Sequence, residues 1–337
     1  MRIRRWRRAF VEKGCSRRAV PGFTGHTKPV GGVRFSPDES QVLTWSEDGS
    51  VRLWPVNSVG SSIVFASNAG RVWNAAFDRT GFHVIAAYED GTARVWSVAK
   101  PNHFVLLDGR EGGSNSVLDA AISPDGKSAI TVYKGGTALC WQIDGHCVPR
   151  VLIRSNVQDE WLEHCAWSYD GKTFAAASSA CRVWVWKESW WRERQVALRG
   201  VGDLAHVGSV VGLALSTDGE QLLTGGSVDG LVRLWRTDGT RRPVEFFGAG
   251  TVTDASFAPD GKRVLGAIES GTVKIWRSDW HELVTFLRSR TSATLTTEQR
   301  VSLLGEDGSR ARSVYEEQEH KFARTPLPAN WTFQYPY

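Results

Sequence analysis

Hydrophobic runs that end in tryptophan recur along most of this chain, and they are the strongest pattern in it. Each run places β-favouring residues just before the indole. The six endings are Arg52-Leu53-Trp54, Arg94-Val95-Trp96, Leu139-Cys140-Trp141, Trp184-Val185-Trp186, Arg233-Leu234-Trp235 and Lys274-Ile275-Trp276. Successive tryptophans are 42, 45, 45, 49 and 41 residues apart. This spacing predicts a repeated unit of about 40–45 residues, the length of a four-stranded propeller blade.

A polar turn recurs in phase with the tryptophans. Its six copies are Ser36-Pro37-Asp38, Asp78-Arg79-Thr80-Gly81, Ser123-Pro124-Asp125-Gly126, Ser168-Tyr169-Asp170-Gly171, Ser216-Thr217-Asp218-Gly219 and Ala258-Pro259-Asp260-Gly261. Proline fixes φ at the first central position, and Asp-Gly accepts the positive φ that follows. A second turn, such as Val228-Asp229-Gly230, precedes the strand that ends at the tryptophan. Each unit is therefore predicted to be a small antiparallel sheet.

Small sheets of this kind cannot bury their faces alone, so the copies must stack against one another. The chain is predicted to be all-β: a β-propeller of about six four-stranded antiparallel blades, or of seven with one incomplete, followed by a short helical tail. The last candidate outer strand is Glu282–Leu287. The composition agrees, because 34 Gly and 16 Trp against one Met favour short strands and tight turns over packed helices. An open ring would leave exposed edges that invite association.

With these repeats in place, the sequence over residues 20–288 resembles the WD-repeat (β-transducin-type) family, in a bacterial style. Gly25-His26 and Ala205-His206 match the opening dipeptide of that family, and Asp48, Asp90 and Asp229 match its turn aspartate. The resemblance implies a structural hydrogen-bond tetrad in two repeats: His26, Ser46, Asp48 and Trp54, and His206, Ser227, Asp229 and Trp235. The turn aspartate is replaced by Gly135, Ala180 and Ser270, so repeats three, four and six are expected to be less rigid.

The resemblance also implies a binding face at one end of the blades. Residues aligned at the starts of the first strands and just before the turn aspartates are expected to edge that face. The candidate partner-binding residues are Arg71, Trp73, Trp161, Glu163, Glu47, Glu89 and Lys134. Arg71, Trp73 and Trp161 lead this set because Trp and Arg are enriched in interface hot spots. The alternative is that the two tryptophans only fill gaps between blades.

The net charge of +5 is concentrated at the N-terminus. Residues 1–18 contain eight basic residues and one acidic residue, which leaves 33 basic and 35 acidic residues in the rest of the chain. The chain after residue 18 is therefore not basic, and the charge there does not imply a surface that binds nucleic acid. Met1–Trp6 also resembles the strand that ends each repeat, so residues 1–18 are expected to be a remnant of an upstream repeat, with the chain a part of a longer array. A basic arm that contacts an acidic partner is the alternative.

The pattern changes after residue 288. Residues 289–325 are predicted to form a helical tail, with a capping box at Thr296–Gln299, a helix from Glu298 to about Leu304 and a second from about Ser309 to Phe322. This segment is similar to the tail of large bacterial WD-repeat proteins. Residues 326–337 form an extended aromatic C-terminus, in which Trp331, Phe333, Tyr335 and Tyr337 alternate with other residues.

No catalytic pattern stands out. The five cysteines lack a C-x-x-C pair, and the eight histidines lack metal-ligand spacing, so no metal site, cofactor or catalytic residue is expected. Unpaired cysteines favour a reducing cytoplasm, and no apolar stretch is long enough to cross a membrane. The leading interpretation is a cytoplasmic, non-catalytic scaffold that binds one or more proteins. The alternative is a nucleic-acid or acidic-surface binder acting through the basic arm, and a propeller enzyme ranks last.

Overall fold

The fold is known from a computed structural model of the chain. The structure describes residues 22–56, 62–66, 69–110, 116–143, 149–155, 160–187, 196–198, 206–240, 242–248, 250–258, 260–278 and 295–321. Two compact units divide after Ile275, one comprising Met1–Ile275 and the other Trp276–Tyr337. The predicted basic arm, the strand Glu282–Leu287 and the aromatic C-terminus all lie outside the described residues.

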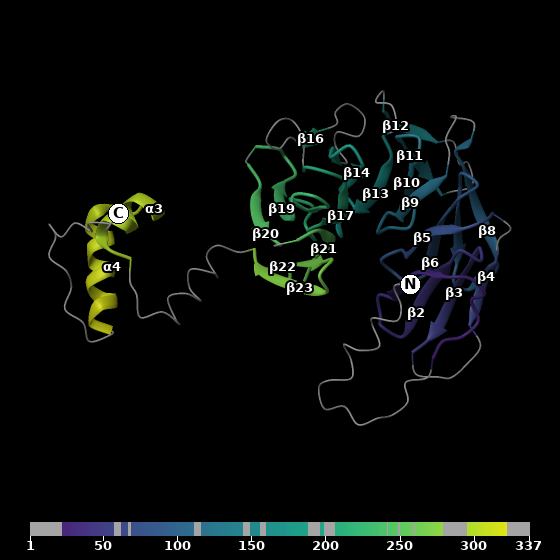
Figure 1. The fold of residues 1–337 in the computed structure, drawn as a ribbon, viewed down its shortest axis with the longest axis horizontal. Coiled ribbons are helices and arrows are strands. Elements are labelled where there is room, and N and C mark those ends of the chain that lie inside the picture. Colours follow the sequence, from purple (N-terminus) through teal and green to yellow (C-terminus); the bar gives the residue numbers. More distant parts are fainter. Residues whose placement is uncertain are drawn as a thin grey trace. The chain divides into compact units, whose positions relative to one another are not determined.

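The first unit is built from six antiparallel sheets that follow one another in sequence order, as the sequence predicts (Figure 1). Blade 1 contains β1 (Val30–Phe35), β2 (Gln41–Ser46), β3 (Ser50–Pro55) and β4 (Ile63–Ala66). Blade 2 contains β5 (Val72–Phe77), β6 (His83–Tyr88), β7 (Thr92–Ser97) and β8 (Lys100–Asp108). Blade 3 contains β9 (Val117–Ile122), β10 (Ser128–Tyr133), β11 (Thr137–Gln142) and β12 (Arg150–Arg154).

The remaining blades repeat the same order. Blade 4 contains β13 (Leu162–Trp167), β14 (Thr173–Ser178), β15 (Val183–Lys187) and β16 (Val196–Leu198). Blade 5 contains β17 (Val210–Leu215), β18 (Gln221–Gly226), β19 (Leu231–Arg236) and β20 (Val244–Phe247). Blade 6 contains β21 (Val252–Phe257), β22 (Arg263–Ile268) and β23 (Thr272–Arg277). Within the described residues blade 6 has three strands, and the prediction of six antiparallel blades is confirmed.

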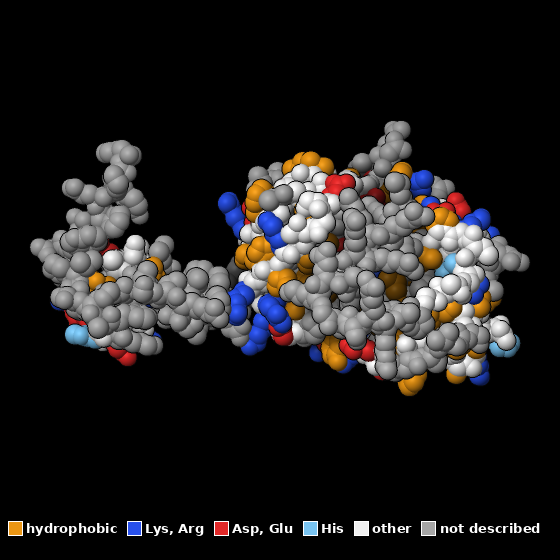
Figure 2. Space-filling view, turned by 60° about the horizontal axis from the view of Figure 1, so that its bottom comes forward, with side chains coloured by type: hydrophobic (Ala, Val, Ile, Leu, Met, Phe, Trp, Pro, Cys, Tyr) orange, Lys and Arg blue, Asp and Glu red, His pale blue; other side chains and the backbone are white. Residues whose placement is uncertain are grey.

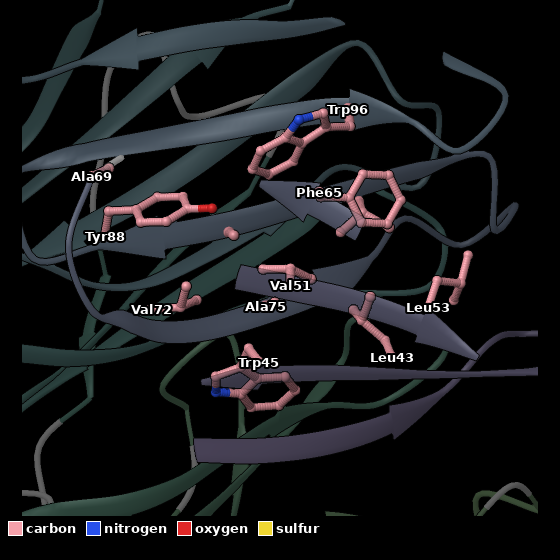
Figure 3. Packing of buried hydrophobic residues seen from close by; sticks show 12 residues of the cluster. Leu43, Trp45, Val51, Leu53, Phe65, Ala69, Val72, Ala75, Tyr88 and Trp96 are labelled. Atoms are coloured by element: carbon pink, nitrogen blue, oxygen red, sulfur yellow. The ribbon is translucent and has the colours of Figure 1, made fainter. Parts of the chain in front are cut away.

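The hydrophobic core lies between consecutive blades. Leu43, Val51 and Leu53 of blade 1 pack against Ala75 and Trp96 of blade 2, and equivalent clusters join the next three pairs of blades (Figure 3). A small residue of the first strand, Ala75, packs against large residues such as Leu53 and Trp96, which lets the sheets approach closely. The repeat tryptophans therefore act as packing residues.

The turns between first and second strands explain why the repeat favours glycine. Gly81, Gly126 and Gly171 take φ values of 73–75° in this turn. Blade 1 places Glu39 there at φ 59°, and the second turn of blade 4 similarly holds Cys181 at φ 65°. Side chains with a Cβ are strained in this region of backbone space.

Replacing Glu39 with glycine is expected to raise the free energy of unfolding by about 0.5–1 kcal/mol, because the left-handed strain is removed. The matched control is Lys127→Gly. Lys127 follows the turn glycine of blade 3 and does not have a positive φ. Glycine at this position should therefore lower the free energy of unfolding by a similar amount. Urea unfolding of both variants measures the two effects. A destabilised Glu39→Gly variant would show that the turn is not strained.

The second unit contains α3 (Thr297–Leu304) and α4 (Gly308–Lys321). The predicted capping box is present at Thr296 and Gln299, and Gly305 ends α3 in the left-handed conformation. The second helix starts at Gly308 rather than Ser309 because the Asp307 carboxylate accepts the backbone N–H groups of Ser309 and Arg310. Ala311 and Tyr315 are buried on the predicted apolar side of α4.

Candidate functional site

Two sets of sequence-predicted residues meet at one end of the blades. In each blade, a residue at the start of the turn between the second and third strands donates its backbone N–H to the carbonyl of a residue just ahead of the first strand. Glu89 pairs in this way with Arg71 at 3.0 Å, and Ser179 with Trp161 at 2.9 Å. The same bond recurs in all six blades. The backbone therefore carries both sets of side chains to the same rim, which we call the rim surface: Glu47, Arg71, Trp73, Glu89, Lys134, Trp161 and Glu163.

The part of the rim surface on blades 1 and 2 is a charged cluster around Arg71. Its guanidinium group lies 3.2 Å from the Glu47 carboxylate and 4.0 Å from the centre of the Trp73 ring. The Glu89 carboxylate accepts the backbone N–H of Arg71 at 3.4 Å. A polar cavity of about 490 Å³ is lined by Glu47, Arg71 and Glu89. Arg71 is thus held in place by a neighbouring acid and an aromatic face.

The part on blades 3 and 4 is aromatic. Trp161 is 39 % exposed, and the Lys134 ammonium group lies 4.5 Å from its ring. Trp73 and Glu163 are half-buried and line a central cavity of about 770 Å³. Burial raises the pKa of the Glu163 carboxyl. Neither tryptophan is fully buried between sheets, and Figure 2 shows hydrophobic side chains on the wall of a hollow in the propeller.

The predicted tetrad of blade 1 needs one correction. His26 contacts Asp48 at 3.0 Å and the Thr44 hydroxyl at 2.8 Å, and the Trp54 indole donates to Thr44 at 2.8 Å. Thr44 thus occupies the place predicted for Ser46. The Ser46 hydroxyl instead donates to the carbonyls of Lys28 and Pro29.

Blade 5 shows the same correction. The Trp235 indole donates to Thr224 at 2.8 Å, and Thr224 lies 2.7 Å from His206, so Thr224 replaces Ser227. The reason is the register of the sheet: Trp235 stands opposite Leu222, and the residue two positions further on the same face is Thr224. Ser227 lies beyond the strand, in the turn. A threonine 10 or 11 residues before the tryptophan is the signal that marks this position, and Thr131 of blade 3 shares it.

Arg233 is a member of the blade 5 network that the sequence does not reveal. Its guanidinium lies 2.7 Å from the Asp229 carboxylate and 2.8 Å from Glu245. Burial would raise the pKa of the Asp229 carboxyl, but His206 and the N–H groups of Leu231 and Val207 outweigh it and lower the pKa. Burial lowers the pKa of His206 below its usual value, and nearby Arg233 acts in the same direction.

This arrangement predicts that the folded protein loses stability as the pH falls, because His206 takes up a proton more readily in the unfolded chain. Because its pKa is lower in the folded protein than its ordinary value of 6.5, the unfolded chain binds the proton first. The stabilisation is complete above pH 6.5 and declines as the pH falls below it. Urea midpoints at pH 7.5 and 5.5 should differ more for the wild type than for His206→Gln. Equal differences in the two proteins would contradict the assignment.

Blade 4 replaces the tetrad with a different buried charge. Glu160 is buried, and its carboxylate contacts the guanidinium of Arg182 and the hydroxyl of Ser155. Burial would raise the pKa of Glu160, but these partners outweigh it and lower the pKa. The pair joins a residue two positions ahead of the first strand to the residue just before the third. The sequence does not reveal this pair because the family pattern places no acid at this position.

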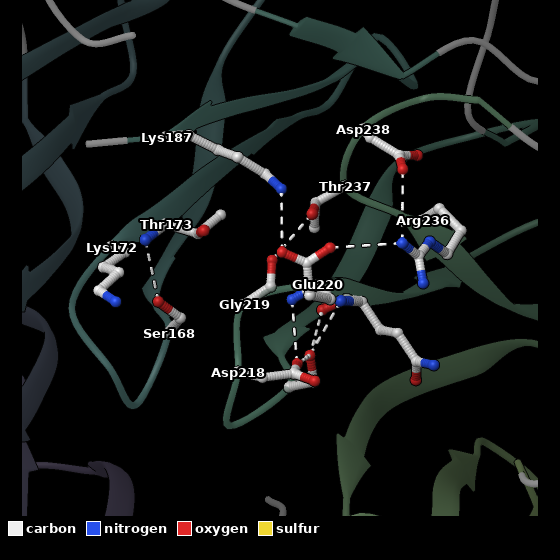
Figure 4. A network of polar contacts seen from close by, with 12 residues as sticks. Ser168, Lys172, Thr173, Lys187, Asp218, Gly219, Glu220, Arg236, Thr237 and Asp238 are labelled. Carbon is white, nitrogen blue, oxygen red and sulfur yellow. Dashed lines mark hydrogen bonds and ion pairs between the residues drawn. The ribbon is translucent and has the colours of Figure 1, made fainter. Parts of the chain in front are cut away.

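The opposite end of the blades carries a polar network of its own (Figure 4). Glu220 lies 3.3 Å from Lys187 of the preceding blade and 3.4 Å from Arg236 of its own. Thr237 donates to the Gly219 carbonyl at 2.8 Å. The Lys187–Glu220 ion pair ties blade 4 to blade 5 through partly exposed side chains, where an ion pair contributes little to stability.

Among the described residues, no group of three or more His, Cys, Asp and Glu side chains lies close enough to hold a metal ion. The same part of the chain contains no helix that is both long and apolar enough to cross a membrane. The described cysteines, Cys140, Cys165 and Cys181, are free thiols. Burial raises the pKa of the Cys140 thiol to about 11, which leaves it protonated and a poor nucleophile at neutral pH.

Comparison with known proteins agrees with the geometry. The family described as "WD domain, G-beta repeat" matches residues 17–55, 61–97, 201–236 and 242–277, which cover blades 1, 2, 5 and 6. Blades 3 and 4, outside these matches, are two of the three blades that lack the turn aspartate.

Two curated relatives resemble most of the chain at low identity. The "WD repeat-containing protein WDS homolog" of Arabidopsis thaliana is 25% identical over 74% of this chain and 47% of its own length. Human "Apoptotic protease-activating factor 1" is 25% identical over 78% of this chain and 20% of its own length. The chain thus spans less than half the length of either relative. Both are eukaryotic proteins and lend no support to the expected bacterial style. The repeats and the six sheets show a β-propeller, and four of its blades match the WD-repeat family.

Proposed function

We propose that this protein is a non-catalytic interaction scaffold whose protein partner docks on the rim surface. The observation that carries the proposal is Trp161, a large aromatic residue that remains 39 % exposed beside Lys134. Trp73, Arg71 and Glu163 continue the same surface to the mouth of the central cavity. Aromatic and Arg anchors next to a cavity are the residue types that dominate protein–protein binding energy.

The charges on the rim surface favour a partner that brings both apolar and charged groups. Glu47, Glu89 and Glu163 alternate with Arg71 and Lys134, so the surface has no strong single sign. This mixture supports a protein partner over a polyanion. We place the protein in the cytoplasm in this proposal, and the free thiols support that placement.

The test is affinity capture with the full chain from the cells that produce it, with partners quantified by mass spectrometry. Trp161→Ala combined with Arg71→Ala is expected to weaken binding of the captured partner by about 30-fold or more, since a hot-spot residue contributes about 2 kcal/mol. Phe82→Ala is the control, because Phe82 is 70% exposed in the turn at the opposite end of β6.

Equal loss in the control, or no loss in the double variant, would contradict the proposal.

The second candidate, nucleic-acid binding through the eight basic residues of the N-terminal arm, is tested in the same preparation. Binding of a DNA duplex to the wild type at 50 and 200 mM salt should be weak and unspecific if the scaffold proposal holds. A tight interaction that falls steeply with salt and survives Trp161→Ala would favour the arm instead.

A further inference from the structure

A pocket of about 380 Å³ opens between blades 3 and 4. It lies at the end of the blades opposite the rim surface, because the turns between first and second strands line it. The pocket shares no residue with the rim surface, so it does not depend on the function proposed above. We call it the interblade pocket, and its lining residues used below are Arg79, Cys140, Trp167, Tyr169, Lys172 and Phe174.

The pocket is present because blade 3 carries a small side chain where its neighbours carry larger ones. Cys140 stands just before the repeat tryptophan, and the residues at this position in blades 1, 2 and 4 pack against the following blade: Leu53, Val95 and Val185. A thiol fills less space than these branched side chains, so space remains between Cys140 and blade 4. The volume of this space falls in the range of small-molecule sites.

Aromatic rings form the wall of the pocket on blade 4. The ring centres of Trp167 and Phe174 are 4.8 Å apart, and Phe174 stacks on Trp186 with a centre-to-centre distance of 5.1 Å. Phe174 and Cys140 are buried, whereas Trp167 is half-buried. The deep part of the pocket is therefore apolar and is held in shape by stacked rings. Such a wall suits a flat apolar group.

The mouth of the pocket carries two cations. Arg79 extends from the turn of blade 2 to blade 4, where its guanidinium group donates to the Tyr169 carbonyl at 2.9 Å and lies over the Tyr169 ring. Lys172 belongs to the same turn as Tyr169 and is exposed. Within the part of the chain that the structure describes, neither Arg79 nor Lys172 forms an ion pair. Both therefore have N–H groups left for a ligand.

Two aspartates also line the mouth, but the turns already use them. Asp125 and Asp170 each accept a serine hydroxyl at 2.6 Å and a lysine backbone N–H at 3.1 Å from their own turn. Asp218 accepts the equivalent pair of bonds in blade 5, so this arrangement belongs to the repeat. No such role accounts for the cations, and the mouth therefore favours an anion.

We propose that the interblade pocket binds a ligand that combines an aromatic body with one carboxylate group. The aromatic body enters between Cys140 and Phe174, where its apolar surface leaves water. The carboxylate stays at the mouth and accepts hydrogen bonds from Arg79 and Lys172. The nearby aspartates disfavour a phosphate, which carries nearly two negative charges. A free aromatic acid and the aromatic C-terminal residue of a peptide share this chemistry.

The probe is indole-3-propionate, titrated against the full chain by ligand-observed NMR. Binding at one site is expected, and tryptamine, which joins the same ring system to an ammonium group, should bind at least tenfold more weakly. Arg79→Gln combined with Lys172→Gln should weaken binding of the acid by about tenfold or more, because hydrogen bonds to a charged group are lost. Lys127→Gln is the matched control: Lys127 is exposed in the neighbouring turn, does not line the pocket and should not affect binding.

A second variant tests the cavity without changing a charge. Cys140→Leu introduces the residue that blade 1 carries at the equivalent position, Leu53, and should fill the pocket. Binding of indole-3-propionate should fall at least tenfold, while the melting temperature stays the same or rises. If leucine lowers the melting temperature, Cys140→Val takes its place, because valine occupies this position in blades 2 and 4.

The proposal would be overturned if the acid does not bind at about 1 mM, if tryptamine binds as tightly, or if binding survives the filled pocket. A peptide that ends in phenylalanine, with a free or an amidated C-terminus, distinguishes the two sources of the ligand. Tighter binding of the free-ended peptide than of indole-3-propionate identifies a peptide terminus, and weaker binding identifies a free acid. Equal binding of the free and amidated peptides would contradict the role of the carboxylate.

Discussion

Replacing Trp96 with alanine is expected to lower the free energy of unfolding by about 3–5 kcal/mol, the cost typical of removing a large buried aromatic side chain. Trp96 is 1% exposed and packs between blades 1 and 2. Its ring centre lies 5.6 Å from that of Phe65 and 5.8 Å from that of Phe104. Alanine would leave a cavity that the hydrogen-bonded sheets on either side cannot close. Since a domain of this kind is stabilised by about 5–15 kcal/mol, much of the margin would be lost.

The matched comparison is Trp161→Ala, because it removes the same side chain from an exposed position. Its loss should cost about 1 kcal/mol or less, mainly the contact with Lys134. Urea unfolding followed by tryptophan fluorescence and circular dichroism measures both variants. Similar costs at the two positions would mean that Trp161 is a packing residue, which would also remove the main support for the rim surface.

The second large effect is expected at Thr224. Changing Thr224 to valine keeps the shape of the side chain but removes the hydroxyl that serves both Trp235 and His206. Both partners are buried, and each unsatisfied polar group costs about 1–3 kcal/mol, so a loss of about 2–4 kcal/mol is expected. The indole resonance of Trp235 in a nitrogen-15 correlation spectrum should shift at the same time.

Ser227→Ala is the control that separates the corrected tetrad from the predicted one. The Ser227 backbone N–H donates to Ser209, an interaction that alanine retains. Its stability should therefore stay within about 0.5 kcal/mol of the wild type. If Ser227→Ala proved the more damaging of the two, the hydrogen-bond assignment in blade 5 would be wrong.

The local features of the fold could be predicted because they are written in short stretches of sequence. The tryptophan intervals and the Asp-Gly turns fix the number and boundaries of the strands, since turn chemistry depends only on neighbouring residues. The capping box at Thr296 could be predicted for the same reason, because it depends only on residues within one helical turn. Sequence spacing also indicated which residues share the rim, because equivalent positions of a repeat must lie at equivalent places in each blade.

The tertiary structure alone decided how side chains meet across strands. Ser46 and Thr44 point to the same face of one strand, and only the pairing of Val42 with Trp54 shows that the indole reaches Thr44. Arg233, Arg182 and Glu160 likewise find their partners through register and burial rather than through spacing. The contrast between Trp96 and Trp161 has the same origin: the sequence determined that both are tryptophans of a repeated β-unit, whereas burial depends on what the neighbouring blade places beside them. Ile275 is the clearest case, because it fits the repeat as well as Leu234 does and yet is 58% exposed, whereas Leu234 is buried.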